Sequence, residues 1–169
     1  GTCGMEAVAR QFANDAEVLV VRNGFFSYRW SQILETGRIT DRITVLKARP
    51  IGDGDQAPWA PPPIEEVEEA IGRIRPALVC VPHVETASGI LLPDDYLARV
   101  GAATTAAGGL FVLDCIASGV VWVDMAALGV DVLVTAPQKG WSAEPGCAAV
   151  CLSGRAVEVL ERTQSSSFA

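Results

Sequence analysis

The feature that most constrains the fold is the regular alternation of short apolar runs with longer segments of helical spacing. The runs are rich in valine, leucine and isoleucine, and they are too short for ordinary helices, so they predict buried strands. Turn-forming residues or a charged residue follow most of them. The predicted strands are residues 17–22, 43–46, 77–81, 109–114, 130–134 and 147–152.

The segments between these runs predict helices. Strands that alternate with helices favour right-handed crossovers, and therefore a mostly parallel sheet in a three-layer α/β/α sandwich. Asp94 is expected to cap one helix, and residues 50–63, rich in Gly, Pro and Asp, are expected to form a long surface loop. The predicted helices are residues 5–12, 25–36, 64–71, 94–107, 125–128 and 155–162.

Composition narrows the class of protein. The chain has 169 residues, about the size of one domain, and its 13 basic and 20 acidic residues give a net charge of −7. This charge argues against nucleic acid or an anionic membrane as a partner, and no apolar run reaches the ~20 residues of a membrane span. The five scattered cysteines and the single histidine, His83, disfavour a zinc site and point to a reducing cytoplasm.

Polar residues follow several of the predicted strands. Asn23-Gly24, Glu85-Thr86, Asp114 and Gln138-Lys139 all stand at or just beyond carboxyl ends. These ends share one edge of a parallel sheet, which is where such sheets hold ligands. Lys139 is therefore a candidate nucleophilic amine, with a solvated loop lysine as the alternative.

A small turn, Gly1-Thr2-Cys3-Gly4, precedes the first predicted helix. Free N–H groups and the positive end of the helix dipole favour a phosphate at such a turn, although Thr and Gly also serve as simple caps.

Asp114 and Lys139 end neighbouring predicted strands, in an arrangement that a pyridoxal phosphate site requires. The lysine amine forms a Schiff base with the aldehyde, and the carboxylate keeps the ring nitrogen protonated. At about 4 Å the carboxylate and a pyridinium attract by roughly 4 kcal/mol in a sheltered site, against about 1 kcal/mol in bulk water. Asp114 therefore needs to be buried for this role.

Five ordered motifs carry a resemblance that covers nearly the whole chain. In order and spacing they resemble the class V aminotransferases, which are fold-type I pyridoxal phosphate enzymes, and most of all the alanine/serine–glyoxylate (serine–pyruvate) branch. The motifs are Gly1 to Ala7, Asn23 to Ser27, His83 to Gly89, Asp114 to Ser118 and Gln138 to Gly140.

The resemblance implies roles for individual residues around pyridoxal 5'-phosphate. Lys139 would form the Schiff base and move the proton, and Asp114 would pair with the ring nitrogen. Thr86 would bind the polar edge of the ring, and Phe26 would stack on one face, a task for which His83 is a second candidate. Ile116 would pack beneath the other face, and Gly1, Thr2, Cys3 and Gln138 would hold the phosphate.

The resemblance also implies an activity and an organisation. We expect transamination between a small amino acid (alanine or serine) and a 2-oxo acid (glyoxylate or pyruvate) by a cytoplasmic homodimer. Residues 1–169 would be the cofactor-binding large domain, truncated at both ends, without the small C-terminal domain and its carboxylate-binding arginine, so the segment alone would be inactive. The alternatives are a 2-aminoethylphosphonate transaminase, a cysteine desulfurase-like class V lyase and a non-catalytic α/β binding domain.

Overall fold

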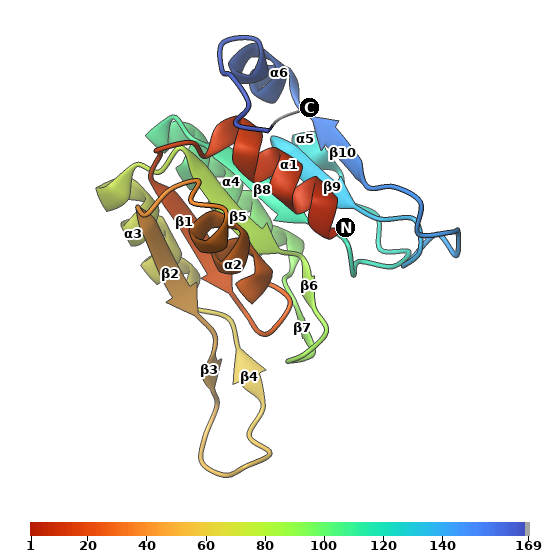
Figure 1. Ribbon diagram of the computed structural model, residues 1–169. Helices are drawn as coiled ribbons and strands as arrows, with labels where there is room; N and C mark the ends of the chain where they lie inside the picture. Colours follow the sequence, from red (N-terminus) through yellow and green to blue (C-terminus); the bar gives the residue numbers. More distant parts are fainter. Residues whose placement is uncertain (168–169) are drawn as a thin grey trace.

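A six-stranded, mostly parallel sheet forms the centre of the computed structural model, which describes residues 1–167 (Figure 1). The strand order is β10-β9-β8-β5-β1-β2, and β10 alone runs antiparallel to its neighbour in this sheet. Phe168 and Ala169, the last residues of the expected domain, lie outside the described residues. The six strands are β1 (Val18–Arg22), β2 (Ile43–Lys47), β5 (Leu78–Pro82), β8 (Leu110–Asp114), β9 (Val132–Thr135) and β10 (Ala149–Leu152).

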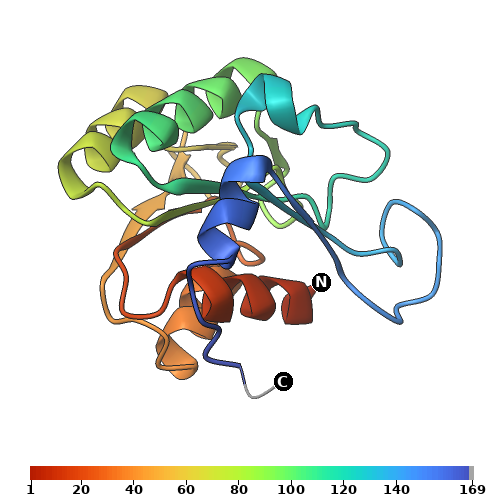
Figure 2. The same cartoon turned by 90° about the horizontal axis from the view of Figure 1, so that it is seen from above.

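Helices cover both faces of the sheet, as Figure 2 shows from above. The three-layer α/β/α prediction is therefore confirmed. On one face lie α1 (Thr2–Phe12) and α2 (Tyr28–Thr36), with α6 (Gly154–Leu160) packed on α1 and β10. On the other lie α3 (Ile64–Ile74), α4 (Asp94–Ala107) and α5 (Met125–Leu128).

The central strands are buried on both faces, which explains why they are apolar along their whole length. In β1, Val18 and Val20 belong to the core beneath α1 and α2, while Leu19 and Val21 belong to the core beneath α3 and α4. Successive side chains of a strand point to opposite faces, so one short run contributes to both cores.

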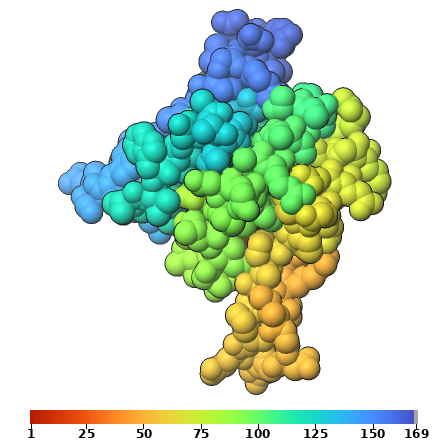
Figure 3. Space-filling view, turned by 180° about the vertical axis from the view of Figure 1, so that it is seen from behind, coloured from red at the N-terminus to blue at the C-terminus, as the bar shows by residue number. Residues whose placement is uncertain are grey.

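Two small antiparallel pairs were not predicted. In the expected loop of residues 50–63, β3 (Arg49–Pro50) pairs with β4 (Trp59–Ala60), and this hairpin projects from the body in Figure 3. The chain reverses through Gly52 and Gly54, whose φ angles of 91° and 116° suit glycine. The second pair joins β6 (Val84–Glu85) to β7 (Ile90–Leu91).

Three local predictions were wrong. The turn expected at Gly1-Thr2-Cys3-Gly4 is instead the first turn of α1, which begins at Thr2. Asp94 does not cap α4, because Pro93 is the N-cap in an extended conformation and Asp94 is already the first helical residue. The helix expected from residue 25 begins at Tyr28 instead, since the preceding residues form a turn that is tied to a neighbouring strand. Among residues 1–167, no helix combines the length and the apolar character needed to cross a bilayer.

Candidate active site

The ends of β5, β8 and β9 lie level with one another at one edge of the sheet. Pro82 is opposite Asp114 in the register, and Asp114 is opposite Val134. The backbone N–H of His83 donates to the Asp114 carbonyl at 3.0 Å. The segments that follow these strands therefore start from neighbouring points, as expected for a parallel sheet.

Asp114 is a buried acid whose charged form is destabilised. Its side chain is 8% exposed, and its Oδ1 accepts a hydrogen bond from the Ile116 N–H at 3.0 Å. Burial raises the pKa of Asp114 to about 6, against the lowering effect of the Ile116 N–H, and the nearby Glu85 raises it further. A cationic partner at this carboxylate would restore its ionised form.

The indole of Trp30 lies close to this acid. Trp30 is fully buried, and its Nε1 has no hydrogen-bond partner of normal length within residues 1–167. Its N–H nevertheless lies near enough to lower the pKa of Asp114. A tryptophan on an amphipathic helix is ordinarily a packing residue, so the sequence carries no signal for this position beside the acid.

Glu85 joins two segments of the site, a role that was not predicted from the sequence. It is fully buried, and its Oε2 accepts from the Ser27 N–H at 2.8 Å and from the Ser27 hydroxyl at 2.6 Å. Its Oε1 accepts from the N–H groups of Phe26 and Ala87, both at 3.2 Å. A Cβ at Gly24 would lie 2.7 Å from Glu85 Cγ, so this close approach requires glycine.

Phe26, which donates to this carboxylate, and Thr86, which follows Glu85 in the chain, both keep their side chains at the surface. The Phe26 ring is 47% exposed and meets Phe25 edge to face, with the ring centroids 5.6 Å apart. Thr86 is exposed in the turn after β6. Both side chains are thus available to a ligand at the edge of the sheet.

The start of α1 lies against the segment after β8. A Cβ at Gly1 would be 2.6 Å from Ile116 Cδ1, so these two residues are in contact. Thr2 begins the helix, and its Oγ1 accepts a hydrogen bond from Arg29 Nη1 at 3.1 Å. Cys3 is exposed in the first turn. The residues expected to bind the phosphate therefore lie next to Ile116, the residue expected beneath the cofactor ring.

Arg29 was missed by the sequence analysis. It brings a guanidinium to the end of α1 at which helix N–H groups are free, and both features favour a phosphate. The one sequence feature that could have indicated this role is its position three residues after Phe26, at the start of α2.

Lys139 stands in an exposed turn after β9, with its N–H donating to the Ala136 carbonyl at 3.3 Å. A Cβ at Gly140 would lie 2.1 Å from the Gly119 carbonyl oxygen, so this turn packs directly on the segment after β8. Gln138 is exposed beside it. Within residues 1–167 no hydrogen bond or ion pair joins the side chains of Gln138 or Lys139 to the other candidates.

His83 is buried, and its ring forms a hydrogen bond with another buried side chain. Its Nδ1 lies 2.7 Å from the Ser118 Oγ, and burial lowers its pKa, against a smaller raising effect of Asp94. Of the two candidates for stacking on a ring, the exposed Phe26 therefore has the more suitable position.

These residues fit pyridoxal 5'-phosphate. Asp114 forms no ion pair within residues 1–167, and a protonated ring nitrogen would give it one. The exposed Phe26 ring offers a stacking surface, and the start of α1 with Arg29 offers donors for a phosphate. The exposed Lys139 amine is free to bond an aldehyde.

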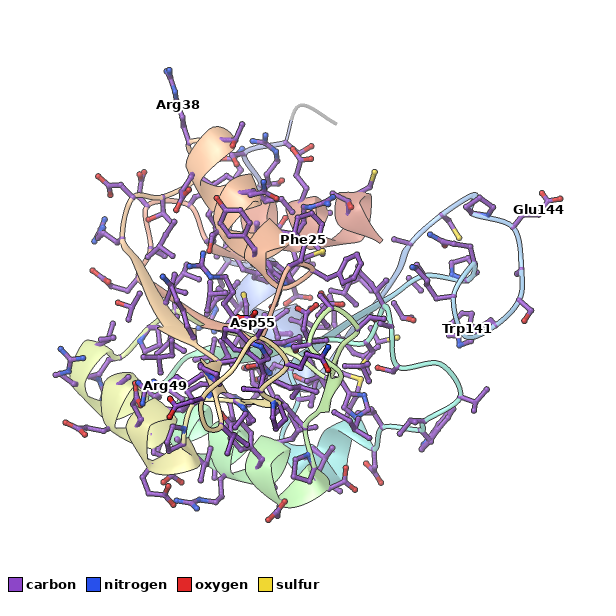
Figure 4. All side chains as sticks on the ribbon, turned by 90° about the horizontal axis from the view of Figure 1, so that it is seen from below. Phe25, Arg38, Arg49, Asp55, Trp141 and Glu144 are labelled. Carbon is purple, nitrogen blue, oxygen red and sulfur yellow. The ribbon has the colours of Figure 1, made fainter. Side chains whose placement is uncertain are left out.

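A separate apolar cavity of about 680 Å³ lies beside α5 and β9. Its walls include Trp122, which is 89% exposed, and Trp141, on the loop that extends from the body in Figure 4. None of the predicted cofactor residues lines it.

Comparison with known proteins identifies the family. The pattern of the family described as Aminotransferase class-V matches residues 1–169. The L-aspartate–glyoxylate aminotransferase of Paracoccus denitrificans is 32% identical over 95% of this chain and 39% of its own length. The 2-aminoethylphosphonate–pyruvate transaminase of Vibrio vulnificus is 30% identical over 86% of this chain and 37% of its own length.

A solved structure of known fold supports the same family. The crystal structure of an alanine–glyoxylate aminotransferase from Nostoc sp. superposes with a TM-score of 0.77 and 30% identity, covering 96% of this chain and 40% of that one. The chain thus spans about two fifths of the length of these relatives. Its sequence and its fold place it in the class V aminotransferase family.

Proposed function

We propose that this chain is the cofactor-binding part of an enzyme that transfers an amino group from a small amino acid, alanine or serine, to a 2-oxo acid, glyoxylate or pyruvate. The observation that supports the proposal most is Asp114, a buried acid with a raised pKa at the end of β8, level with the strand that leads to Lys139. That pairing supplies both groups that the chemistry of pyridoxal phosphate needs from its protein.

When bound, pyridoxal phosphate supplies an electron sink for the carbanion of the substrate. Lys139 Nζ would hold the cofactor through its aldehyde and, when released, would be the base that moves the proton of the substrate Cα. Asp114 would keep the ring nitrogen protonated.

The other candidates orient the ring. Phe26 covers one face and Ile116 the other, and Thr86 donates to the polar edge. Gln138 joins the start of α1 in binding the phosphate, together with Gly1, Thr2, Cys3 and Arg29.

The relatives support the substrate class. Two of the three named above act with glyoxylate and one with pyruvate. A 2-aminoethylphosphonate transaminase is the second candidate, favoured by the Vibrio relative. No observation favours the desulfurase-like or the non-catalytic alternative.

We further propose that the full-length protein is a cytoplasmic homodimer. The exposed apolar side chains Val120 and Trp122, 92% and 89% exposed, support an interface, because exposed apolar patches mark binding surfaces. The free thiols of Cys3, Cys147 and Cys151 are compatible with a reducing compartment.

Single half-reactions of the full-length protein loaded with pyridoxal phosphate test the substrate proposal. Alanine, serine, aspartate and 2-aminoethylphosphonate are added separately, and formation of each oxo product is measured. Turnover of alanine or serine above the others is expected. Preferential turnover of 2-aminoethylphosphonate would establish the second candidate, and no turnover of any donor would contradict both.

A further inference from the structure

A cavity of about 350 Å³ lies at the carboxyl ends of β1 and β2, next to the β3–β4 hairpin. Its size is within the range of small-molecule sites. None of the predicted cofactor residues lines it, so it is separate from the site described above. The lining residues that carry the argument are Arg22, Asn23, Phe25, Lys47, Trp59 and Ser88.

Two polar side chains in this lining have buried atoms without a hydrogen-bond partner in the described part of the chain. Asn23 is only 2% exposed, and neither its Nδ2 nor its Oδ1 has a hydrogen-bond partner within residues 1–167. The Oγ of Ser88 is buried and unpaired as well. Buried polar groups are expensive to leave unpaired, so the donors Asn23 Nδ2 and Ser88 Oγ favour a ligand that accepts hydrogen bonds.

Two positively charged side chains also line the cavity. Arg22 and Lys47 are directly opposite in the parallel β1–β2 register, so their like charges repel and an anion beside them would relieve that repulsion. Neither forms an ion pair within the described part of the chain, although acidic residues outnumber basic ones overall. The guanidinium of Arg22 is held over the Tyr28 ring, 4.8 Å from its centroid.

Aromatic side chains complete the walls. Phe25 is 64% exposed and Trp59 is 49% exposed. Exposed rings beside unpaired polar groups are typical of ligand sites, where apolar walls hold the body of the ligand and a few polar groups orient it.

We propose that this cavity binds a small dicarboxylate. Its two carboxylates neutralise Arg22 and Lys47, its oxygens accept from Asn23 Nδ2 and Ser88 Oγ, and its carbon chain lies against Trp59. The cavity adjoins the Glu85 hydrogen-bond network, since Gly24 and Ala87 belong to both. Occupancy is thereby linked to the segments that carry Phe26 and Thr86.

The test uses succinate as the probe and the Trp59 indole as the reporter. The full-length protein loaded with pyridoxal phosphate is labelled with ¹⁵N at tryptophan, and a Trp59→Phe variant assigns the Trp59 indole resonance. We expect a saturable shift of this resonance with succinate and none with succinamide, which has the same shape without charge.

Matched variants locate the site. Lys47→Gln should weaken succinate binding about tenfold and Ser88→Ala about fivefold. Arg73→Gln, which removes an exposed cation on α3, should leave it unchanged. Lys139→Ala should also bind succinate normally, so failure of this proposal is distinguishable from failure of the proposed function. An equal response to succinamide, or full affinity in Lys47→Gln, would overturn the proposal.

Discussion

The Ser27 hydroxyl donates to Glu85 Oε2 at 2.6 Å, across a sequence separation of 58 residues. This bond and three backbone N–H groups satisfy a carboxylate that is fully buried. Charge-assisted hydrogen bonds of this kind are about twice as strong as neutral ones. The Phe26 and Thr86 segments are therefore fixed relative to each other before any cofactor binds.

Glu85→Gln should destabilise the protein by about 2 kcal/mol, because an amide NH₂ then faces backbone donors that lose their acceptor. Urea unfolding followed by circular dichroism measures this loss. Glu144→Gln, on the exposed loop seen in Figure 4, is the control and should unfold like the native chain. Equal stability of Glu85→Gln and the native chain would show that the carboxylate is not needed.

Asp114→Asn should make the cofactor-free protein more stable at pH 8. Burial raises the Asp114 pKa from 3.8 to about 6, and a shift of this size corresponds to about 3 kcal/mol. The ionised Asp114 destabilises the folded state by this amount. The destabilisation is complete above about pH 6 and is absent below pH 3.8, where the acid is protonated in both states.

Unfolding free energies of both proteins between pH 4 and pH 8 check this assignment. The advantage of Asp114→Asn should shrink as the pH falls through 6 and vanish near 4, where the native aspartate is protonated. An advantage that is independent of pH would contradict a buried, titrating Asp114. In the same variant, affinity for pyridoxal phosphate should fall, since the ring nitrogen loses its anionic partner.

Arg29→Gln should weaken pyridoxal phosphate binding about tenfold in the full-length protein, because one charge-assisted contact to the phosphate is lost. Binding of pyridoxal, which lacks the phosphate, should not change. Arg38→Gln, an exposed arginine after α2, serves as the control. Equal losses for pyridoxal and its phosphate would place Arg29 outside the phosphate site.

The strands and their end points could be predicted from the sequence, because they depend on local composition. The apolar run at Val18–Arg22 is a strand because it is buried on both faces, and Asp114 ends its strand because the run stops there. The Glu85 bonds to Phe26 and Ser27 were not predictable, since these donors are 59 and 58 residues away in the sequence and only the fold brings them near. The β3–β4 pair was missed because Pro50 and the glycines around it favour a loop.

The bond between the protein and its cofactor tests the central claim most directly. The full-length protein is incubated with pyridoxal phosphate, reduced with borohydride, digested and analysed by mass spectrometry. We predict a pyridoxyl group on Lys139 and none on Lys47, the only other lysine of the chain. A pyridoxyl group on Lys47, or an unmodified Lys139 peptide, would contradict the assignment.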